Sequence, residues 1–175
     1  MYATTVPRIV LTILVLLLVS FPGSSEAFLY HATRKAIAKR ILMRGVNPAK
    51  FSAKARFGKG LYLSRKPSTA LSEKGRNSAV IRMRGSAYVK KRAIDLRKPT
   101  RGRLRSLLGK KIDLRGATRK NVIGPKIGRK LGRIAGKKGT AIQYRSVRNG
   151  GTNVFVPKSL FTRKPGVIRP TKMPR

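Results

Sequence analysis

The stretch ARFGKGLYLSRKPSTAL at residues 55–71 combines a glycine turn, a short strand and the start of a helix. The Gly-Lys-Gly turn leads into LYLS at 61–64, where apolar residues alternate with Tyr as they do in a short strand. Either Ser64 or Ser68 can cap the helix that follows. Glycine turns expose backbone N–H groups, so this turn is either an ordinary connection or the lip of a site for a phosphorylated ligand.

The segment before this stretch predicts a strand, a helix and a turn, in that order. Residues 28–32 form an apolar run of strand length, and Thr33 can cap a helix in which Ile37 and Ile41 share one face. Gly45 stands where such a helix ends. A loop punctuated by Pro and Gly then leads to the stretch quoted above.

Two strands, a helical segment and two more strands are predicted after this stretch. Strands are predicted at 78–84, 87–96, 141–144 and 153–156, the last two around a Gly-Gly turn. Apolar residues at helical spacing predict helices within 101–136. The middle of the chain is therefore rich in strands, and the pattern turns helical from Arg101 to Gly136.

Three glycines at the end of the helical segment recur every four residues, at 128, 132 and 136. Glycine weakens a helix but lets its backbone approach another element closely. A membrane-dimer interpretation of this spacing needs an apolar segment of about 20 residues, and this segment is rich in Lys and Arg instead. We therefore expect this helix to pack closely against another part of the fold.

The charge balance is extreme, because 43 Lys and Arg stand against 4 Asp and Glu, a net charge of +39 in 175 residues. Repulsion at this density opposes a compact state, so an anionic partner is expected: nucleic acid, anionic lipid or polysaccharide. The apolar residues, 41% of the chain, come in periodic blocks between turns, which favours a folded core over disorder. The chain has no cysteine, so no disulfide stabilises it.

The N-terminus has the three parts of a secretory signal: Arg8, the apolar run 9–19, and small residues up to Ala27. The apolar run is shorter than the roughly 20 residues of a membrane-spanning helix; an uncleaved membrane anchor is the alternative. Cleavage after Ala27 removes one acidic and one basic residue, so the net charge stays at +39. We predict a signal peptide at 1–27 and a secreted protein.

The residues available for catalysis argue against most hydrolase classes. Outside the predicted signal the chain has one histidine and three carboxylates, Glu73, Asp95 and Asp113. A zinc site or a two-metal site needs several N, S or O ligands, and a glycosidase needs two acids flanking one bond. No metal cofactor is therefore expected. Basic and aromatic residues beside glycine turns instead suit an anionic ligand that can stack, such as a dinucleotide.

Four residues are candidates for binding such a ligand. Arg56 can hold a pyrophosphate with two hydrogen bonds, Lys59 lies nearby in the sequence, and Tyr62 can stack on a flat ring. Each has an ordinary alternative: Arg56 and Lys59 are then two solvated cations among many, and Tyr62 is a core residue. His31, the single histidine, can equally be a half-buried structural residue.

Several segments, taken in order, resemble a known enzyme superfamily. LYHATRKAIAKRIL, followed by ARFGKGLYLSRKPSTAL, is similar to the first two motifs of ADP-ribosyltransferases of the His-Tyr-Glu type, a Tyr-His-Gly-Thr-like strand and a Gly-x-Gly-(Ile/Leu)-Tyr strand. STALSE, AIDLRKP and AIQYRSVRNGGTNVFVP resemble the RES domain, an NAD-consuming branch of that fold. The resemblance covers most of residues 29–161.

This resemblance implies a fold and a domain organisation. The fold is α+β, with an ADP-ribosyltransferase-like mixed, mostly antiparallel, split β-sheet and short flanking helices. The RES or ADP-ribosyltransferase-like domain spans 28–164, and a basic Pro-containing tail follows at 165–175.

The resemblance also implies roles for individual residues. His31 matches the histidine that holds the nicotinamide ribose, and Tyr62 matches the tyrosine that stacks on nicotinamide. The arginine, glutamate and serine for which the RES domain is named correspond to Arg56, Glu73 and Ser146. The predicted catalytic residues are Tyr62, Glu73 and Ser146, and the predicted dinucleotide-binding residues are His31, Thr33, Arg56, Lys59, Gly60 and Asn153. The catalytic interpretation requires Glu73 to lie near Tyr62 in space.

The implied function is that of a secreted, toxin-like enzyme that cleaves the nicotinamide–ribose bond of NAD by hydrolysis, phosphorolysis or ADP-ribosyl transfer. Transferases carry a glutamate before the last core strand where this chain has Gly151-Thr152-Asn153, which argues against transfer to a protein. NAD is intracellular, so the enzyme would act in the cytoplasm of a target cell, and an acidic neutralising protein is an expected partner. The alternative is a non-enzymatic basic protein that binds nucleic acid or an anionic membrane surface on a degenerate form of this scaffold.

Overall fold

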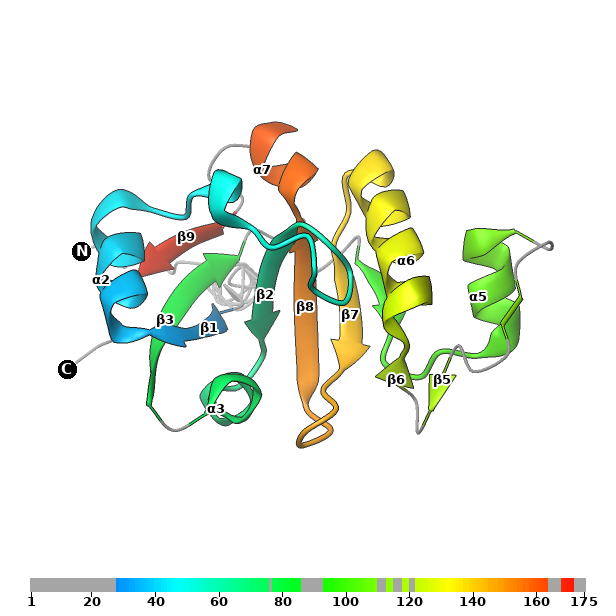
Figure 1. Ribbon diagram of the computed structural model, residues 1–175, viewed down its shortest axis with the longest axis horizontal. Helices are drawn as coiled ribbons and strands as arrows, with labels where there is room; N and C mark the ends of the chain where they lie inside the picture. The colour runs from blue at the N-terminus through cyan, green and yellow to red at the C-terminus, as the bar shows by residue number, and fades with distance from the viewer. Residues whose placement is uncertain are drawn as a thin grey trace, which may run out of the picture.

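The computed structural model describes residues 28–75, 77–85, 93–109, 113–114, 118–119, 122–163 and 168–171. At its centre lies a seven-stranded sheet in the order β4-β7-β8-β2-β1-β3-β9 (Figure 1). Its strands are β1 (Phe28–Arg34), β2 (Gly60–Ser64), β3 (Ser78–Gly85), β4 (Ile94–Leu96), β7 (Ile142–Arg145), β8 (Thr152–Pro157) and β9 (Ile168–Thr171). Neighbouring strands are antiparallel except β4 and β7, which run parallel, so the sheet is mixed and mostly antiparallel.

Short helices flank this sheet. They are α2 (Lys35–Arg44), the 3-10 helix η1 (Pro48–Lys50), α3 (Pro67–Lys74), α5 (Arg101–Leu108), α6 (Pro125–Lys138) and α7 (Lys158–Arg163). In Figure 1, α2 lies beside β1 and β3 at one end of the sheet, while α6 and α5 lie next to each other at the other end. The strands β5 (Thr118–Arg119) and β6 (Val122–Ile123) form a separate antiparallel pair.

The sheet is split between β1 and β2. These two strands are paired at Tyr30 and Ser64 alone, whereas β1 pairs with β3 over seven residues from Phe28 to Arg34 and β2 pairs with β8 along its full length. Backbone groups of β1 and β2 beyond the single pair must find other partners, because an unpaired buried N–H or C=O group is costly. The candidate site lies at this split.

Two hydrophobic clusters lie on opposite faces of the sheet, and β8 contributes to both by alternation. Val154 and Val156 pack in one cluster with Leu61 and Leu63 of β2. Phe155, between them in sequence, packs in the other cluster with residues of β4, α5, α6 and β7. On β2 the order is reversed, so Tyr62 lies on the face of Phe155 and α6. Both faces of β2 thus contribute to the core, and Tyr62 is its one half-buried residue.

The predicted elements are largely confirmed, but two predicted caps are wrong. Thr33 lies inside β1, where its backbone pairs with Ala79, so α2 begins only after Arg34. Ser64 is the last residue of β2 and Ser68 lies within α3; the cap residue of α3 is Lys66, without a side-chain cap hydrogen bond. In both places the residue that local preference selects as a cap is paired in the sheet as part of a strand. Of the strand predicted at 87–96, Ile94–Leu96 forms β4, and residues 86–92 lie outside the described part.

The two ends of the chain are described in part. The predicted signal at 1–27 lies outside the described residues. Within the segment assigned to a basic tail at 165–175, Ile168–Thr171 pairs with β3 as the edge strand β9. Among the described residues, no helix is both long enough and apolar enough to cross a membrane.

Candidate functional site

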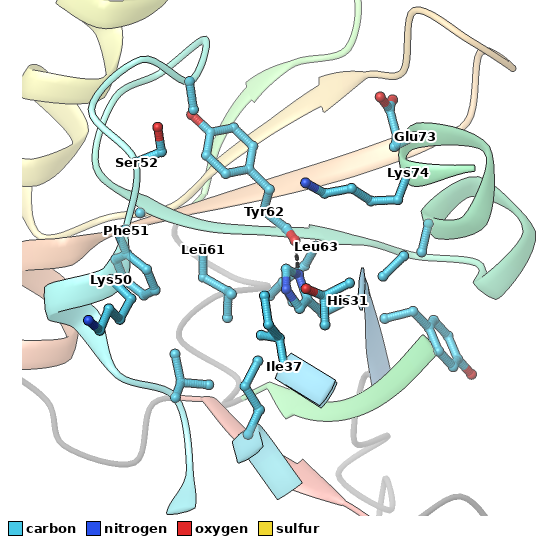
Figure 2. A pocket seen from close by; sticks show the side chains of 18 of the residues that line it. His31, Ile37, Lys50, Phe51, Ser52, Leu61, Tyr62, Leu63, Glu73 and Lys74 are labelled. Atoms are coloured by element: carbon cyan, nitrogen blue, oxygen red, sulfur yellow. Dashed lines mark hydrogen bonds between the residues drawn. The ribbon is translucent and has the colours of Figure 1, made fainter. Parts of the chain in front are cut away.

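A cavity of about 1210 Å³ lies at the split in the sheet. Residues of β1, β2, α2, α3 and the loop that precedes β2 line it (Figure 2). Its volume is above the ~300–1,000 Å³ typical of sites for small molecules, so it has room for an elongated dinucleotide. The cavity therefore lies where β1 and β2 diverge from their single pair, Tyr30 and Ser64.

His31 connects the two strands where they diverge. Its Nδ1 donates a hydrogen bond to the backbone carbonyl of Tyr62 over 2.9 Å, as the dashed line in Figure 2 shows. The side chain thus takes the place of a backbone partner from β1, and Nδ1 carries the proton of the neutral ring. Burial lowers the pKa of His31 below its ordinary value of 6.5; the bond to Tyr62 opposes this shift, and the charge of Lys74 adds to it. His31 is therefore neutral at pH 7.

His31 gives a prediction about stability against pH. Because the folded protein binds this proton less tightly than the unfolded chain does, the free energy of unfolding should fall as the pH drops below about 6.5. His31 is the single histidine of the chain, so the His31→Gln variant should lose the part of the slope that lies between about pH 5 and 6.5. Urea unfolding of both proteins across this range measures the difference. Equal slopes would contradict a depressed pKa at His31.

Tyr62 is held at both of its ends. The phenol oxygen accepts a hydrogen bond from the backbone N–H of Phe57 (2.8 Å) and donates one to the carbonyl of Gly58 (3.2 Å). Its ring packs against Phe155 with 5.1 Å between the ring centroids. Burial raises the pKa of Tyr62 to about 12, so the phenol stays protonated at physiological pH. The ring is a fixed, half-buried platform at the wall of the cavity, and its hydroxyl is occupied by the glycine turn.

The turn that carries Arg56 rests on helix α6. A Cβ atom on Gly128 would lie 2.5 Å from the carbonyl oxygen of Arg56, and one on Gly132 would lie 1.8 Å from that of Phe57. Neither position can therefore hold a side chain unless the backbone moves. The close approach that the glycine spacing predicted is confirmed, and its partner is the Arg56–Phe57 backbone at the edge of the cavity.

The half-buried Glu73 is the centre of a polar network. Its Oε1 accepts one hydrogen bond from Ser146 Oγ (2.6 Å) and another from Asn153 Nδ2 (2.9 Å). Asn153 is fixed in turn, since its Oδ1 accepts a bond of 2.6 Å from Ser64 Oγ. Among the described residues, no hydrogen bond reaches Oε2 of Glu73. One carboxylate oxygen is thus held by protein donors while the other is left for a ligand.

The loop between β7 and β8 is locked onto α3 beside this network. Asn149 donates from Nδ2 to Thr69 Oγ1 (3.2 Å) and accepts from the backbone N–H of Gly151 (3.0 Å). A Cβ atom on Gly151 would lie 2.3 Å from Thr69 Oγ1, so the loop and the helix are in tight contact. This contact positions Ser146 against Glu73 across a sequence separation of 73 residues.

The cavity is strongly positive. Five cations line it, namely Arg40, Arg44, Lys50, Arg56 and Lys74, and Glu73 is the one carboxylate among its lining residues. Such a lining favours a ligand that carries several negative charges, such as a pyrophosphate. In the described part of the chain, no group of three or more His, Cys, Asp and Glu lies together as a metal ion would need.

The structure brings most of the predicted site residues together. The cavity is lined by His31, Thr33, Arg56, Gly60, Tyr62, Glu73 and Asn153. Ser146 is buried behind Glu73 and is not one of the lining residues. Lys59 is not a lining residue either, and its carbonyl accepts a hydrogen bond from the backbone of Lys158. Glu73 and Tyr62, which the catalytic interpretation requires to lie close together, both line this cavity.

Sequence reasoning missed two residues of this site. Tyr144 lines the cavity and is 7% exposed; its ring lies 5.8 Å from the guanidinium carbon of Arg56, and burial raises its pKa. Thr69 holds the loop before β8, as described above. Thr69 stands four residues before Glu73 on one helix, so helical spacing could have indicated that the two share a face. No local signal indicated Tyr144.

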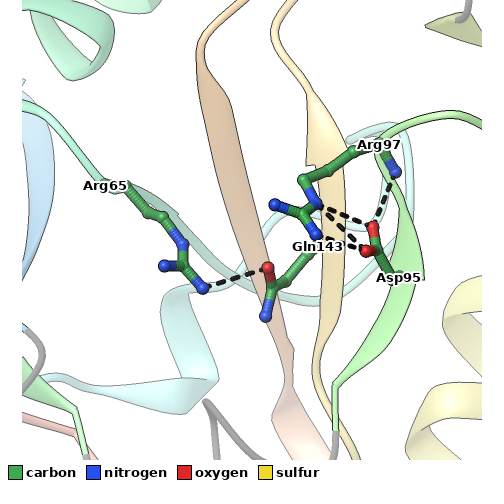
Figure 3. A network of polar contacts seen from close by, with 4 residues as sticks. All are labelled: Arg65, Asp95, Arg97 and Gln143. Atoms are coloured by element: carbon green, nitrogen blue, oxygen red, sulfur yellow. Dashed lines mark hydrogen bonds and ion pairs between the residues drawn. The ribbon is translucent and has the colours of Figure 1, made fainter.

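A second carboxylate lies outside the cavity. Asp95 on β4 forms an ion pair with Arg97 in which Oδ2 and Nη2 are 2.5 Å apart (Figure 3). On the neighbouring strand β7, Gln143 accepts a hydrogen bond of 3.1 Å from Arg65. Both residues of the ion pair are about half exposed, and hydrogen bonding to Arg97 lowers the pKa of Asp95. Asp95 is thus a solvated surface carboxylate and a natural control for Glu73.

Comparisons with known proteins bear on the fold. No family model matches the sequence, and no curated protein matches it either. Among solved structures, the chain is similar to a chain of the crystal structure of the M. tuberculosis MbcT–MbcA toxin–antitoxin complex, with a TM-score of 0.50 and 12% sequence identity. The match covers 84% of this chain and 82% of that one. Together with the split, mostly antiparallel sheet, it confirms the ADP-ribosyltransferase-like α+β fold predicted from the sequence.

Proposed function

We propose that this protein binds NAD in the cavity at the split of the sheet and cleaves its nicotinamide–ribose bond. The observation that carries the proposal is the arrangement of Tyr62 and Glu73 in one cavity lined by five cations. The cations suit the pyrophosphate, Tyr62 offers a ring for stacking, and Glu73 offers a fixed carboxylate with one free oxygen. The shared fold with a chain of a toxin–antitoxin complex supports a toxin of this kind.

The chemistry of the bond explains why one carboxylate is sufficient. Nicotinamide in NAD is a cationic leaving group, so it departs with the bonding electron pair and needs no general acid. The ribose that remains develops positive charge at its anomeric carbon, and a fixed negative charge beside it lowers the barrier. Ser146 and Asn153 hold Glu73 before the reaction, so the carboxylate does not have to reorient as the charge develops.

The acceptor of the ADP-ribose distinguishes three reactions: hydrolysis, phosphorolysis and transfer. The segment Gly151-Thr152-Asn153 stands where transferases place a second glutamate, which favours a small acceptor, water or phosphate, over a protein. Product analysis separates the three, because hydrolysis gives ADP-ribose, phosphorolysis gives a phosphorylated ADP-ribose, and transfer labels a macromolecule.

The biological setting is a proposal of its own. We infer a RES-type toxin that leaves the producing cell through the predicted signal at 1–27 and acts on NAD in the cytoplasm of a target cell. An acidic protein that neutralises it is the expected partner, since the similar structure is a toxin–antitoxin complex and this chain carries a net charge of +39. Signal cleavage is tested by sequencing the N-terminus of the exported protein.

The experiment that tests the activity follows nicotinamide release from NAD by the purified protein. Tyr62→Ala should lower kcat/KM about 5- to 150-fold, because stacking of a base on an aromatic ring contributes about 1–3 kcal/mol. Tyr62→Phe keeps the ring and should retain most of the activity, although it loses the bonds to Phe57 and Gly58. No nicotinamide release by folded wild-type protein, with or without phosphate, would overturn the proposal.

A second candidate function rests on the charge alone. A non-enzymatic protein that binds polyanions on this scaffold also accounts for the net charge of +39. It requires neither Tyr62 nor Glu73, so substitutions at these positions would leave its binding unchanged. Such a protein has no need of a carboxylate held by two donors in a cavity, and this feature favours the enzyme.

A further inference from the structure

One face of α6 consists entirely of cations. Five residues on this face are exposed: Lys126, Arg129, Lys130, Arg133 and Lys137. At 100° per residue they fall within an arc of about 100° around the helix axis. The opposite face is buried, with Ile127, Leu131 and Ala135 packed in the core. Figure 1 shows α6 along one side of the molecule with α5 next to it.

Folding alone does not account for this face. Like charges three or four residues apart on a helix destabilise it by about 0.2–0.5 kcal/mol per pair. The five cations form several such pairs, and α6 contains no Asp or Glu that could offset them. If the exposed face of α6 carried mixed or uncharged residues, the buried face would pack in the core equally well. The face therefore opposes stability unless an anionic partner covers it.

The spacing of the charges matches a phosphate backbone. From Lys126 to Lys137 the helix rises about 16 Å, so the face carries one positive charge per about 3–4 Å. A strand of double-helical DNA carries one negative charge per about 3.4 Å of axis. The neighbouring helix α5 carries three further exposed arginines, Arg101, Arg103 and Arg105.

We propose that the basic face of α6 binds the phosphate backbone of a nucleic-acid duplex without regard to sequence. The exposed residues of the face are Lys and Arg, and beside it only Pro125 and the half-buried Ile134 of α6 bring an apolar side chain to the surface, so the helix lacks the broad apolar side that enters a lipid interface. It also lacks the exposed aromatic rings on which the bases of a single strand stack. Phosphate contacts from a continuous row of cations suit a duplex best.

The test uses the purified full chain and fluorescently labelled DNA and RNA duplexes of about 20 base pairs, with anisotropy measured against salt. Replacing the five face residues by Gln should lower duplex affinity at least about tenfold near 0.15 M salt and reduce the salt slope by about 4 to 5. A control protein has Gln at five exposed lysines elsewhere: Lys35, Lys39, Lys54, Lys66 and Lys98. The control loses the same net charge and should change duplex affinity much less.

Three outcomes would overturn the proposal. Equal losses in the two variants would mean that diffuse charge binds the duplex, and tighter binding of a single strand would exclude a duplex site. Loss of binding to vesicles of phosphatidylserine, with duplex binding retained, would assign the face to a membrane. Replacing exposed Lys and Arg on a helix by Gln relieves repulsion, so the variant should fold. Its nicotinamide release should equal that of the wild type, which separates this proposal from the enzymatic one.

Discussion

The Glu73→Gln variant should release nicotinamide from NAD about 10²- to 10³-fold more slowly than the wild type, with little change in stability. Removing the charge removes the stabilisation of the developing ribose cation, and electrostatic effects of this kind have that magnitude in other enzymes. Gln keeps an oxygen at the position of Oε1, so Ser146 and Asn153 can still donate to it. The loss should therefore appear in kcat, since binding of the pyrophosphate depends on the cations.

Asp95→Asn is the matched control for this change. It removes the same single negative charge from a half-exposed ion pair with Arg97, outside the cavity. Exposed pairs contribute about 0–1 kcal/mol to stability, so both nicotinamide release and folding should stay close to those of the wild type. Equal activities of Glu73→Gln and the wild type would contradict a catalytic role for the carboxylate, while equal losses in both variants would indicate a general effect of charge.

The strands around the site could be predicted from the sequence because their signals are local. Apolar alternation at 61–64 and the Gly-Gly turn before 153–156 each marked a strand that the structure contains. The helix caps were wrong at Thr33 and Ser64 because pairing with β3 and β8 includes these two residues in strands. Local propensity is a weak prior wherever a strand runs directly into a helix.

The site could be predicted only as separate residues. Glu73, Ser146 and Asn153 were candidates through the family resemblance, but nothing local indicates that one carboxylate oxygen accepts from both of the others across 73 and 80 residues. The split of the sheet depends on a single pair, Tyr30 and Ser64, and no sequence pattern reveals where a ladder stops. The glycine spacing likewise predicted that α6 packs closely against another element, but it did not indicate that this element is the Arg56–Phe57 backbone.

The Gly132→Ala variant should be less stable than the wild type by about 1–3 kcal/mol and should lose nicotinamide-releasing activity as well. A Cβ atom at this position would lie 1.8 Å from the carbonyl oxygen of Phe57 and 2.8 Å from its carbonyl carbon. These are backbone atoms, so no side-chain rotation relieves the overlap. Either α6 or the turn must move, although Ala by itself favours a helix by about 1 kcal/mol over Gly.

The loss of activity follows from what Phe57 holds. Its ring is 2% exposed and packs on Phe155 and Tyr144, while its backbone N–H donates to the hydroxyl of Tyr62. Moving the turn therefore moves the aromatic platform of the cavity. Gly102→Ala in α5 is the control, because a Cβ atom there meets nothing within 4 Å. This variant should be more stable than the wild type by about 0.5–1 kcal/mol. If urea unfolds both variants at the same concentration, α6 does not support the site through this contact.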